Sequence, residues 1–185
     1  MESKRILLRQ WHEEDAEALF QLASDPEVGP RAGWMPHRSV EESRTVIRSI
    51  FHNGHTWAIE EHRLPGSGTI APPRPDCTIV GCICYYPCGE SNIEIGPDDA
   101  EVGYWVGHPY WNLGFATEAL QLLVGYCFRE KGFRTLWADH LESNPASGRV
   151  LTKCGFRDTG RVNRLSHLPF GSDSPVLIWH LDNPC

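Results

Sequence analysis

The stretch from residue 101 to residue 119 reads Glu-Val-Gly-Tyr-Trp-Val-Gly-His-Pro-Tyr-Trp-Asn-Leu-Gly-Phe-Ala-Thr-Glu-Ala. Its first part is rich in residues that favour a β-strand, and its last part begins a helix whose apolar spacing continues to Glu130. Asn112 and Gly114 lie between them and tolerate left-handed backbone. Because the first N–H groups of a helix have no acceptor within it, this turn predicts an anion bound at the helix start.

Outward from this turn, strands and helices alternate along the chain. Upstream, the patterns predict strands at 5–11, 55–61 and 77–86, helices at 13–23 and 39–53, and loops at 28–38, 64–76 and 87–99. Downstream, they predict strands at 133–139, 156–159 and 176–180, a helix at 144–154, and a loop at 163–174. Three consecutive strands followed by strand–helix–strand order predict an α/β (α+β) fold. We expect one domain over residues 1–185, with a mixed, mostly antiparallel twisted sheet of about seven strands flanked by about four helices.

Composition excludes several classes of function. The net charge of -7 argues against nucleic acid as a main partner, and no apolar run is long enough to cross a membrane. No signal peptide is evident at the N-terminus. The seven cysteines lack the spacing of a zinc site or a disulfide framework, which favours reduced thiols, a cytoplasmic location and no metal.

Three motifs together resemble the acetyl-CoA motifs of the GNAT superfamily of N-acetyltransferases. They are Glu101-Val-Gly-Tyr-Trp105, Tyr110-Trp111-x-x-Gly114-x-Ala-Thr-Glu-Ala119, and the Asn144-Pro-Ala-Ser147 helix start. The likeness is greatest to the branch that includes the ribosomal-protein N-terminal acetyltransferases, and it covers nearly the whole chain. The family usually has Gln or Arg where Trp111 stands and often Gly where Asn112 stands.

The resemblance implies acetyl-CoA as the acetyl donor. Its pyrophosphate would bind backbone amides of the turn, with help from the Thr117 hydroxyl. These amides belong to Trp111, Asn112, Leu113, Gly114, Phe115, Ala116 and Thr117. Its pantetheine arm would pair with the strand near Tyr104, Trp105 and Val106, which a bulge at Gly103 would open. Asn144 would contact the arm. The competing interpretation of Asn144 is a helix N-cap.

The implied chemistry is direct attack of a primary amine, from a peptide N-terminus or a small molecule, on the thioester. Glu101 is the candidate general base, although a solvated glutamate at a strand end is the alternative. A backbone N–H of the same strand would stabilise the oxyanion. Many relatives use a tyrosine as proton donor where Leu151 stands, so Ser147 is the candidate donor, with helix packing as its alternative role. Trp34, Tyr85 and Phe170 are predicted to line the acceptor pocket.

Two other functions remain open at this point. A non-catalytic acyl-CoA-binding module would keep the turn and lack the chemistry. A nucleotide-binding enzyme would place a different phosphate on the same turn. The sequence leaves the oligomeric state open, as a monomer or a homodimer.

Overall fold

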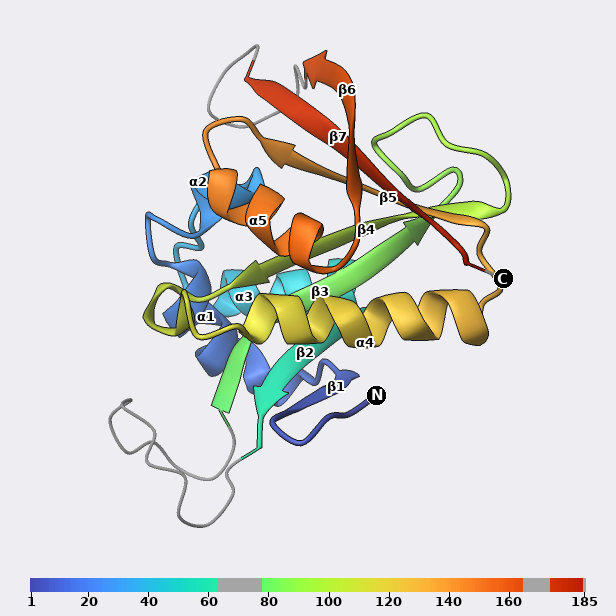
Figure 1. Cartoon of the computed structure of the whole chain (residues 1–185). Coiled ribbons are helices and arrows are strands. Elements are labelled where there is room, and N and C mark those ends of the chain that lie inside the picture. The colour runs from blue at the N-terminus through green and yellow to red at the C-terminus, as the bar shows by residue number, and fades with distance from the viewer. Residues whose placement is uncertain (63–77, 165–173, 185) are drawn as a thin grey trace.

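A twisted sheet forms the centre of the computed structural model, which describes residues 1–62, 78–164 and 174–184 (Figure 1). Over these residues its strands are β1 (Ile6–Gln10), β2 (Thr56–Glu61), β3 (Thr78–Pro87), β4 (Asp99–Val106), β5 (Thr135–Leu141), β6 (Arg157–Arg164) and β7 (Pro175–Asp182). They lie in the order β1-β2-β3-β4-β5-β7-β6, and only β4 and β5 are parallel. The prediction of a mixed, mostly antiparallel sheet is therefore confirmed. The predicted loop at 64–76 and Phe170 lie outside the described residues.

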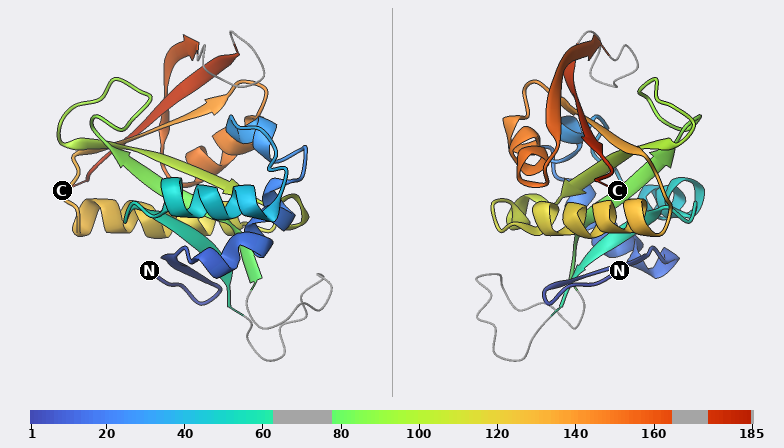
Figure 2. Two further views of the ribbon diagram at one scale, coloured as in Figure 1. Left: turned by 180° about the vertical axis from the view of Figure 1, so that it is seen from behind. Right: turned by 45° about the vertical axis from the view of Figure 1, so that its right-hand side comes forward.

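Helices cover both faces of the sheet. They are α1 (Ala16–Ala23), α2 (Gly29–Ala32), α3 (Val40–Val46), α4 (Phe115–Arg129) and α5 (Pro145–Lys153), with short helical turns η1 (Glu13–Asp15), η2 (Ile47–Phe51) and η3 (His108–Tyr110). Helices α4 and α5 lie on one face, and α1 and α3 lie on the other (Figure 2). The predicted parallel crossover is β4–α4–β5.

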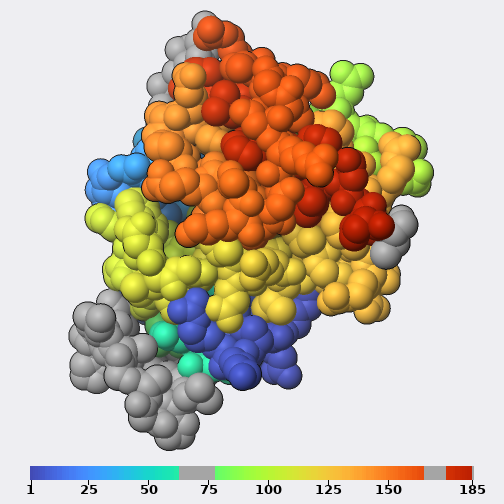
Figure 3. Space-filling model, viewed as in Figure 1, coloured from blue at the N-terminus to red at the C-terminus, as the bar shows by residue number. Residues whose placement is uncertain are grey.

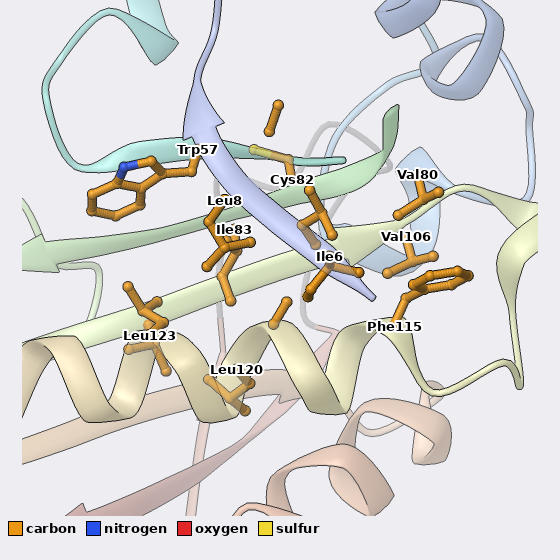
Figure 4. Close-up of a cluster of buried hydrophobic side chains, with 14 of the residues drawn as sticks. Ile6, Leu8, Trp57, Val80, Cys82, Ile83, Val106, Phe115, Leu120 and Leu123 are labelled. Atoms are coloured by element: carbon orange, nitrogen blue, oxygen red, sulfur yellow. The ribbon is translucent and has the colours of Figure 1, made fainter. Parts of the chain in front are cut away.

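The core lies mainly between the sheet and α4 (Figure 4). Ile83 on β3 and Leu120 and Leu123 on α4 are fully buried. Burying a side chain of this size is worth about 1.5–3 kcal/mol, so the apolar stripe of α4 is enough to fix that helix on the sheet. The stripe has the helical spacing that the sequence predicts.

Two predicted segments differ from the structure. The predicted loop at 28–38 contains α2, which begins with Gly29–Pro30 and ends at Gly33, where φ is 88°. Pro30 suits the first helical turn, and Gly33 supplies the left-handed residue that ends the helix. The predicted strand at 156–159 is β6, which continues to Arg164 and takes in the start of the predicted loop at 163–174. Because β6 is an edge strand with mostly exposed residues, it lacks the apolar alternation that marks a strand.

Strands β4 and β5 separate after a short paired stretch. Their last paired residues are Glu101 and Trp137, whereas β5 continues beside β7 as far as Leu141. The predicted bulge at Gly103 is wrong, because the register between β3 and β4 is unbroken through that residue. The opening between β4 and β5 arises from the divergence of two parallel strands, which Figure 1 shows clearly.

Candidate active site

A cavity of about 980 Å³ lies at this opening and has walls from both faces of the sheet. On the side of α4 and α5 we call it the groove, lined by Tyr104, Trp111, Asn112, Gly114, Phe115, Ala116, Thr117, Asn144, Ser147, Arg149 and Lys153. On the side of α3 we call it the chamber, lined by Trp34, Met35, His37, Glu42, Val46, Ile50, Phe51, Cys84, Tyr86, Glu101, Trp105 and Asp139. Strand alternation separates the two, because even-numbered residues of β4 face α4 and α5 and odd-numbered residues face α3.

The turn before α4 adopts the left-handed backbone that its residues tolerate. Asn112 has φ of 62°, and Gly114, the N-cap residue, has φ of 86°. No side chain of the described residues caps this helix, and its first backbone bond runs from the Glu118 N–H to the Gly114 carbonyl at 3.1 Å. The amides from Phe115 to Thr117 are therefore not used by the helix and belong to residues that line the groove.

Arg5 holds this turn from outside. Its Nη1 donates to the Leu113 carbonyl at 2.9 Å, and its Nε donates to the Glu118 carboxylate at 2.8 Å. The start of α4 thus lies between the N-terminal segment, drawn in blue in Figure 3, and the orange α5. Leu113, predicted to bind the donor, is 48% exposed and does not line the cavity.

The side chain of Trp111 secures the turn to the end of β4. Its indole Nε1 donates to the Val106 carbonyl at 2.7 Å, and the guanidinium of Arg31 lies 5.2 Å from its ring centroid. Arg31 therefore brings a cation from α2 to this turn. Arg149 and Lys153 of α5 add positive charge to the groove wall. Cations and unused amides together suit a polyphosphate.

The backbone of β4 presents polar groups to the opening. The Gly107 N–H donates to the Val80 carbonyl at 2.9 Å, so in an antiparallel ladder Trp105 and Gly103 also bond to β3. The N–H and C=O groups of Tyr104 and Val102 then point the other way, toward the gap left by β5. The family resemblance implied pairing of the pantetheine arm at Tyr104–Val106, but the Val106 carbonyl already accepts a hydrogen bond from Trp111.

Ser147 and Tyr104 form a hydroxyl pair in the groove. Their side-chain oxygens are 2.9 Å apart, and the Tyr104 hydroxyl also lies 3.0 Å from the Ser147 carbonyl. Burial raises the pKa of Tyr104, which keeps the phenol protonated. The sequence predicted Tyr104 only as a backbone contact, so its hydroxyl role was missed.

Asn144 occupies the N-cap position of α5 but makes no side-chain cap there, so the N-cap interpretation is wrong. Its Nδ2 donates instead to the Arg31 carbonyl at 3.1 Å. This bond joins α5 to α2 at the edge of the cavity. The Asn144 side chain is thus held where a ligand in the groove would contact it.

Glu101 is buried in the chamber wall, with 5% of its surface exposed. Its Oε2 accepts hydrogen bonds from the Ser91 hydroxyl at 2.7 Å and from the Asn92 backbone N–H at 2.9 Å. The solvated alternative is therefore wrong. The segment between β3 and β4 fixes this carboxylate in one position.

Asp139 is a second carboxylate in the chamber and was not among the site residues predicted from the sequence. Burial and the negative charge of Glu101 raise the pKa of Asp139 to about 7. One signal was available: Asp139 ends a predicted strand that follows the Glu101 strand in a parallel crossover. The register of the two strands, which pairs Glu101 with Trp137, is not readable from the sequence, so this signal alone could not place Asp139 near Glu101.

The predicted aromatic residues separate into two groups. Trp34 lines the chamber and packs edge-on against Trp105, with ring centroids 5.5 Å apart. Tyr85 does not line the cavity; it faces α4 and packs in the core near Phe133. Its neighbour Tyr86 takes the position in the chamber wall, because successive strand residues point to opposite faces.

Within residues 1–62, 78–164 and 174–184, no group of three or more His, Cys, Asp or Glu side chains is arranged to hold a metal ion. No helix in these ranges is long and apolar enough to span a bilayer.

Comparison with known sequences gives a family match and relatives of similar length. Residues 5–157 match the acetyltransferase (GNAT) domain. An uncharacterised N-acetyltransferase of Bacillus licheniformis is 30% identical, over 85% of this chain and 82% of that protein. A second one, from Bacillus subtilis, is 28% identical over 86% and 84% of the two chains.

Solved structures share the fold. A GNAT-family acetyltransferase of Bacillus anthracis has a TM-score of 0.75 at 21% identity, over 99% of this chain and 98% of that one. The spermidine N-acetyltransferase of Vibrio cholerae, solved with CoA and spermine, has a TM-score of 0.72 at 15% identity, over 98% and 97%. A ribosomal-protein α-N-acetyltransferase solved with coenzyme A has a TM-score of 0.73 at 19% identity, over 97% and 95%.

Proposed function

Since the chain belongs to the acetyltransferase (GNAT) family, we propose that it transfers the acetyl group of acetyl-CoA directly to a primary amine. One observation supports this most strongly. The uncapped start of α4 and the open backbone edge of β4 line one cavity, whose lining also includes the buried Glu101 and the half-buried Asp139 carboxylates. An anion site, a strand edge and a proton acceptor are what the transfer requires.

The donor would lie in the groove. Its pyrophosphate would accept hydrogen bonds from the amides of Phe115, Ala116 and Thr117, with Arg31 and Lys153 nearby. A second hollow of about 630 Å³, lined in part by Lys4, Gly114 and Lys153, adjoins the turn and suits a further phosphate. The pantetheine arm would pair with the backbone of Tyr104 and Val102. The thioester would then reach the gap between β4 and β5.

The amine would attack the thioester carbonyl from the chamber. A new N–C bond forms and the C–S bond breaks, while a backbone N–H of β4 stabilises the oxyanion of the intermediate. One proton passes from nitrogen to a chamber carboxylate, for which the sequence predicts Glu101. One proton passes to the CoA thiolate, for which the Tyr104–Ser147 pair is placed in the groove.

The walls of the chamber indicate the class of acceptor. Within the described residues they include three carboxylates, Glu42, Glu101 and Asp139, and no Lys or Arg. Burial lowers the pKa of His37, so this histidine adds no positive charge near neutral pH. Apolar side chains such as Met35 and Ile50 form the remainder. A cationic amine attached to an apolar body fits this surface, whether a small molecule or a peptide N-terminus.

An amine panel with acetyl-CoA tests the proposal. Spermidine, tyramine and an alanine-initiated peptide would each be incubated with the enzyme, and free CoA would be followed with a thiol reagent. At least one amine should increase CoA release above the amine-free rate. The double variant Glu101→Gln with Asp139→Asn should still bind CoA but lose this release.

Binding of CoA by the wild type without amine-dependent release would contradict the proposal. It would favour the alternative of a non-catalytic acyl-CoA-binding module. The cytoplasmic location and the oligomeric state, monomer or homodimer, stay predictions.

A further inference from the structure

Asp139 stands where the opening of the sheet begins. Glu101 and Trp137 are the last paired residues of β4 and β5, and Asp139 follows Trp137 by two positions. Residues two apart in a strand share a face, so Asp139 lies on the Glu101 side of the sheet, about 7 Å further along β5. At that point β4 has diverged, and the Asp139 carboxylate lines the cavity.

The two carboxylates differ in what they already bind. Glu101 Oε2 accepts two hydrogen bonds, from Ser91 and Asn92, and both come from the segment that covers it. With two donors on one oxygen, this side chain serves to fix the segment and the end of the paired stretch. Within the described part of the chain, the Asp139 carboxylate has no hydrogen-bond or ion-pair partner.

On this basis we propose that Asp139 is the catalytic carboxylate, which binds the attacking ammonium and removes its proton, and that Glu101 is a positioning residue. This inference rests on the proposed function of the site. Protons and electrons balance in this step: the bound ammonium gives one proton to an Asp139 oxygen, which passes it to solvent, and the lone pair of the free amine forms the N–C bond. As the intermediate collapses, the nitrogen gives its second proton to Asp139 and the C–S electrons leave with sulfur. Asp139 then returns its proton to solvent.

The electrostatic surroundings of Asp139 agree with this role. Its pKa of about 7 leaves the carboxyl half ionised at neutral pH and basic enough to compete for the proton of an amine. The titratable or charged groups around it are Glu101 on β4, Tyr86 on β3, His37 and Glu42 from the α2–α3 side, and His180 and Arg161, which contact the neighbouring Trp137 ring. Glu101 contributes directly, because its negative charge favours the protonated form of Asp139.

Kinetics of single variants against pH distinguish the two roles. The probe is the best acceptor of the amine panel, and kcat/KM is measured from pH 5.5 to 9. In the wild type, kcat/KM should rise through pH 7, as Asp139 becomes ionised. Asp139→Asn should lower kcat/KM at pH 7 by about 100-fold or more and remove this rise. Asp139→Glu should restore part of the activity.

Glu101→Gln should behave differently. It should keep kcat/KM within about tenfold of wild type and move the rise to lower pH, because loss of the neighbouring charge lowers the pKa of Asp139. Glu142→Gln is the matched control, since Glu142 is exposed just after β5 and does not line the cavity. It should leave the profile unchanged.

Folding and donor binding are checked separately by thermal unfolding with and without CoA. A soluble Asp139→Asn variant that CoA stabilises as it does wild type isolates the chemical step. If this variant instead keeps at least half of the wild-type kcat/KM while Glu101→Gln abolishes it, the inference is overturned and the proposed function stands. Lack of amine-dependent release by the wild type would contradict the proposed function itself.

Discussion

The hydroxyl groups of Tyr104 and Ser147 are hydrogen-bonded to each other, and single substitutions separate their contributions to proton transfer. The Tyr104 phenol remains protonated because burial raises its pKa, and its hydroxyl also bonds to the Ser147 main-chain carbonyl. Ser147→Ala keeps that carbonyl, so we expect kcat to stay within about threefold of wild type. Tyr104→Phe removes the only proton that the phenol can give, so we expect kcat to fall about tenfold or more.

Measurement of kcat at saturating acetyl-CoA checks this order. Tyr85→Phe is a suitable control, because Tyr85 lies in the core and outside the cavity. A larger loss for Ser147→Ala than for Tyr104→Phe would show that serine is the donor, as the sequence alone predicted.

Asp139 should also have a measurable effect on stability. Its pKa is about 7 in the folded chain and about 3.9 in an unfolded chain. The folded state therefore binds the proton more tightly, and the stability that this proton contributes is lost as pH rises from about 4 to 7. Asp139→Asn does not carry this penalty. The quantity to compare is the free energy of unfolding of Asp139→Asn minus that of wild type. We expect this difference to be about 1–3 kcal/mol larger at pH 8 than at pH 4.5.

Urea unfolding of both proteins at the two pH values gives this difference. Other groups titrate alike in the two chains, so the comparison isolates Asp139. An equal difference at both pH values would show that the Asp139 carboxyl has an ordinary pKa.

At single residues, the sequence was most informative where backbone geometry limits the choice. Asn112 and Gly114 were identified as residues that tolerate left-handed backbone, and both adopt it. Asp139 and Tyr85 were harder, because their roles depend on which face of a strand meets which helix. That assignment requires the packing of α3 and α4 on opposite faces, which no local pattern specifies.

The start of α4 provides a test at the level of a single element. Gly114 and Gly132 both have positive φ, 86° and 71°, but only Gly114 lies at the cavity. Alanine at either position should destabilise the fold by about 1 kcal/mol through backbone strain. Relief of that strain at Gly114 would rotate the amides at the start of α4, so CoA affinity should fall about tenfold or more in Gly114→Ala alone.

Thermal unfolding and calorimetric titration with CoA measure the two effects. Equal CoA affinity in Gly114→Ala and Gly132→Ala would show that the start of α4 does not hold the donor.

Among the elements, long periodic segments were predicted well and irregular ones were not. The apolar stripe of α4 and the β-forming residues of β3 identify those elements directly. Helix α2 has four residues, too few to show a period, and β6 is mostly exposed. The opening after Glu101 was expected from a bulge and comes instead from strand divergence, a tertiary feature.

For the molecule as a whole, ligands should stabilise the fold according to how well they fit the groove. CoA at one hundred times its dissociation constant should contribute about 2.7 kcal/mol, which for a chain of this length raises Tm by about 5–10 °C. ATP offers phosphates but no pantetheine arm for the edge of β4. It should raise Tm less than CoA at equal concentration.

Differential scanning fluorimetry with matched magnesium-free solutions is sufficient for this comparison. Stabilisation by ATP and not by CoA would favour the nucleotide-binding alternative.

The separation of β4 from β5 also bears on the order in which the two reactants bind. The groove and the chamber lie on opposite faces of the sheet, and both adjoin the unpaired part of β4. Neither reactant has to leave before the other arrives, and no acetylated enzyme needs to form. Initial rates at several fixed amine concentrations should therefore give reciprocal plots whose lines intersect, and each product should inhibit most effectively against the reactant that shares its face of the sheet.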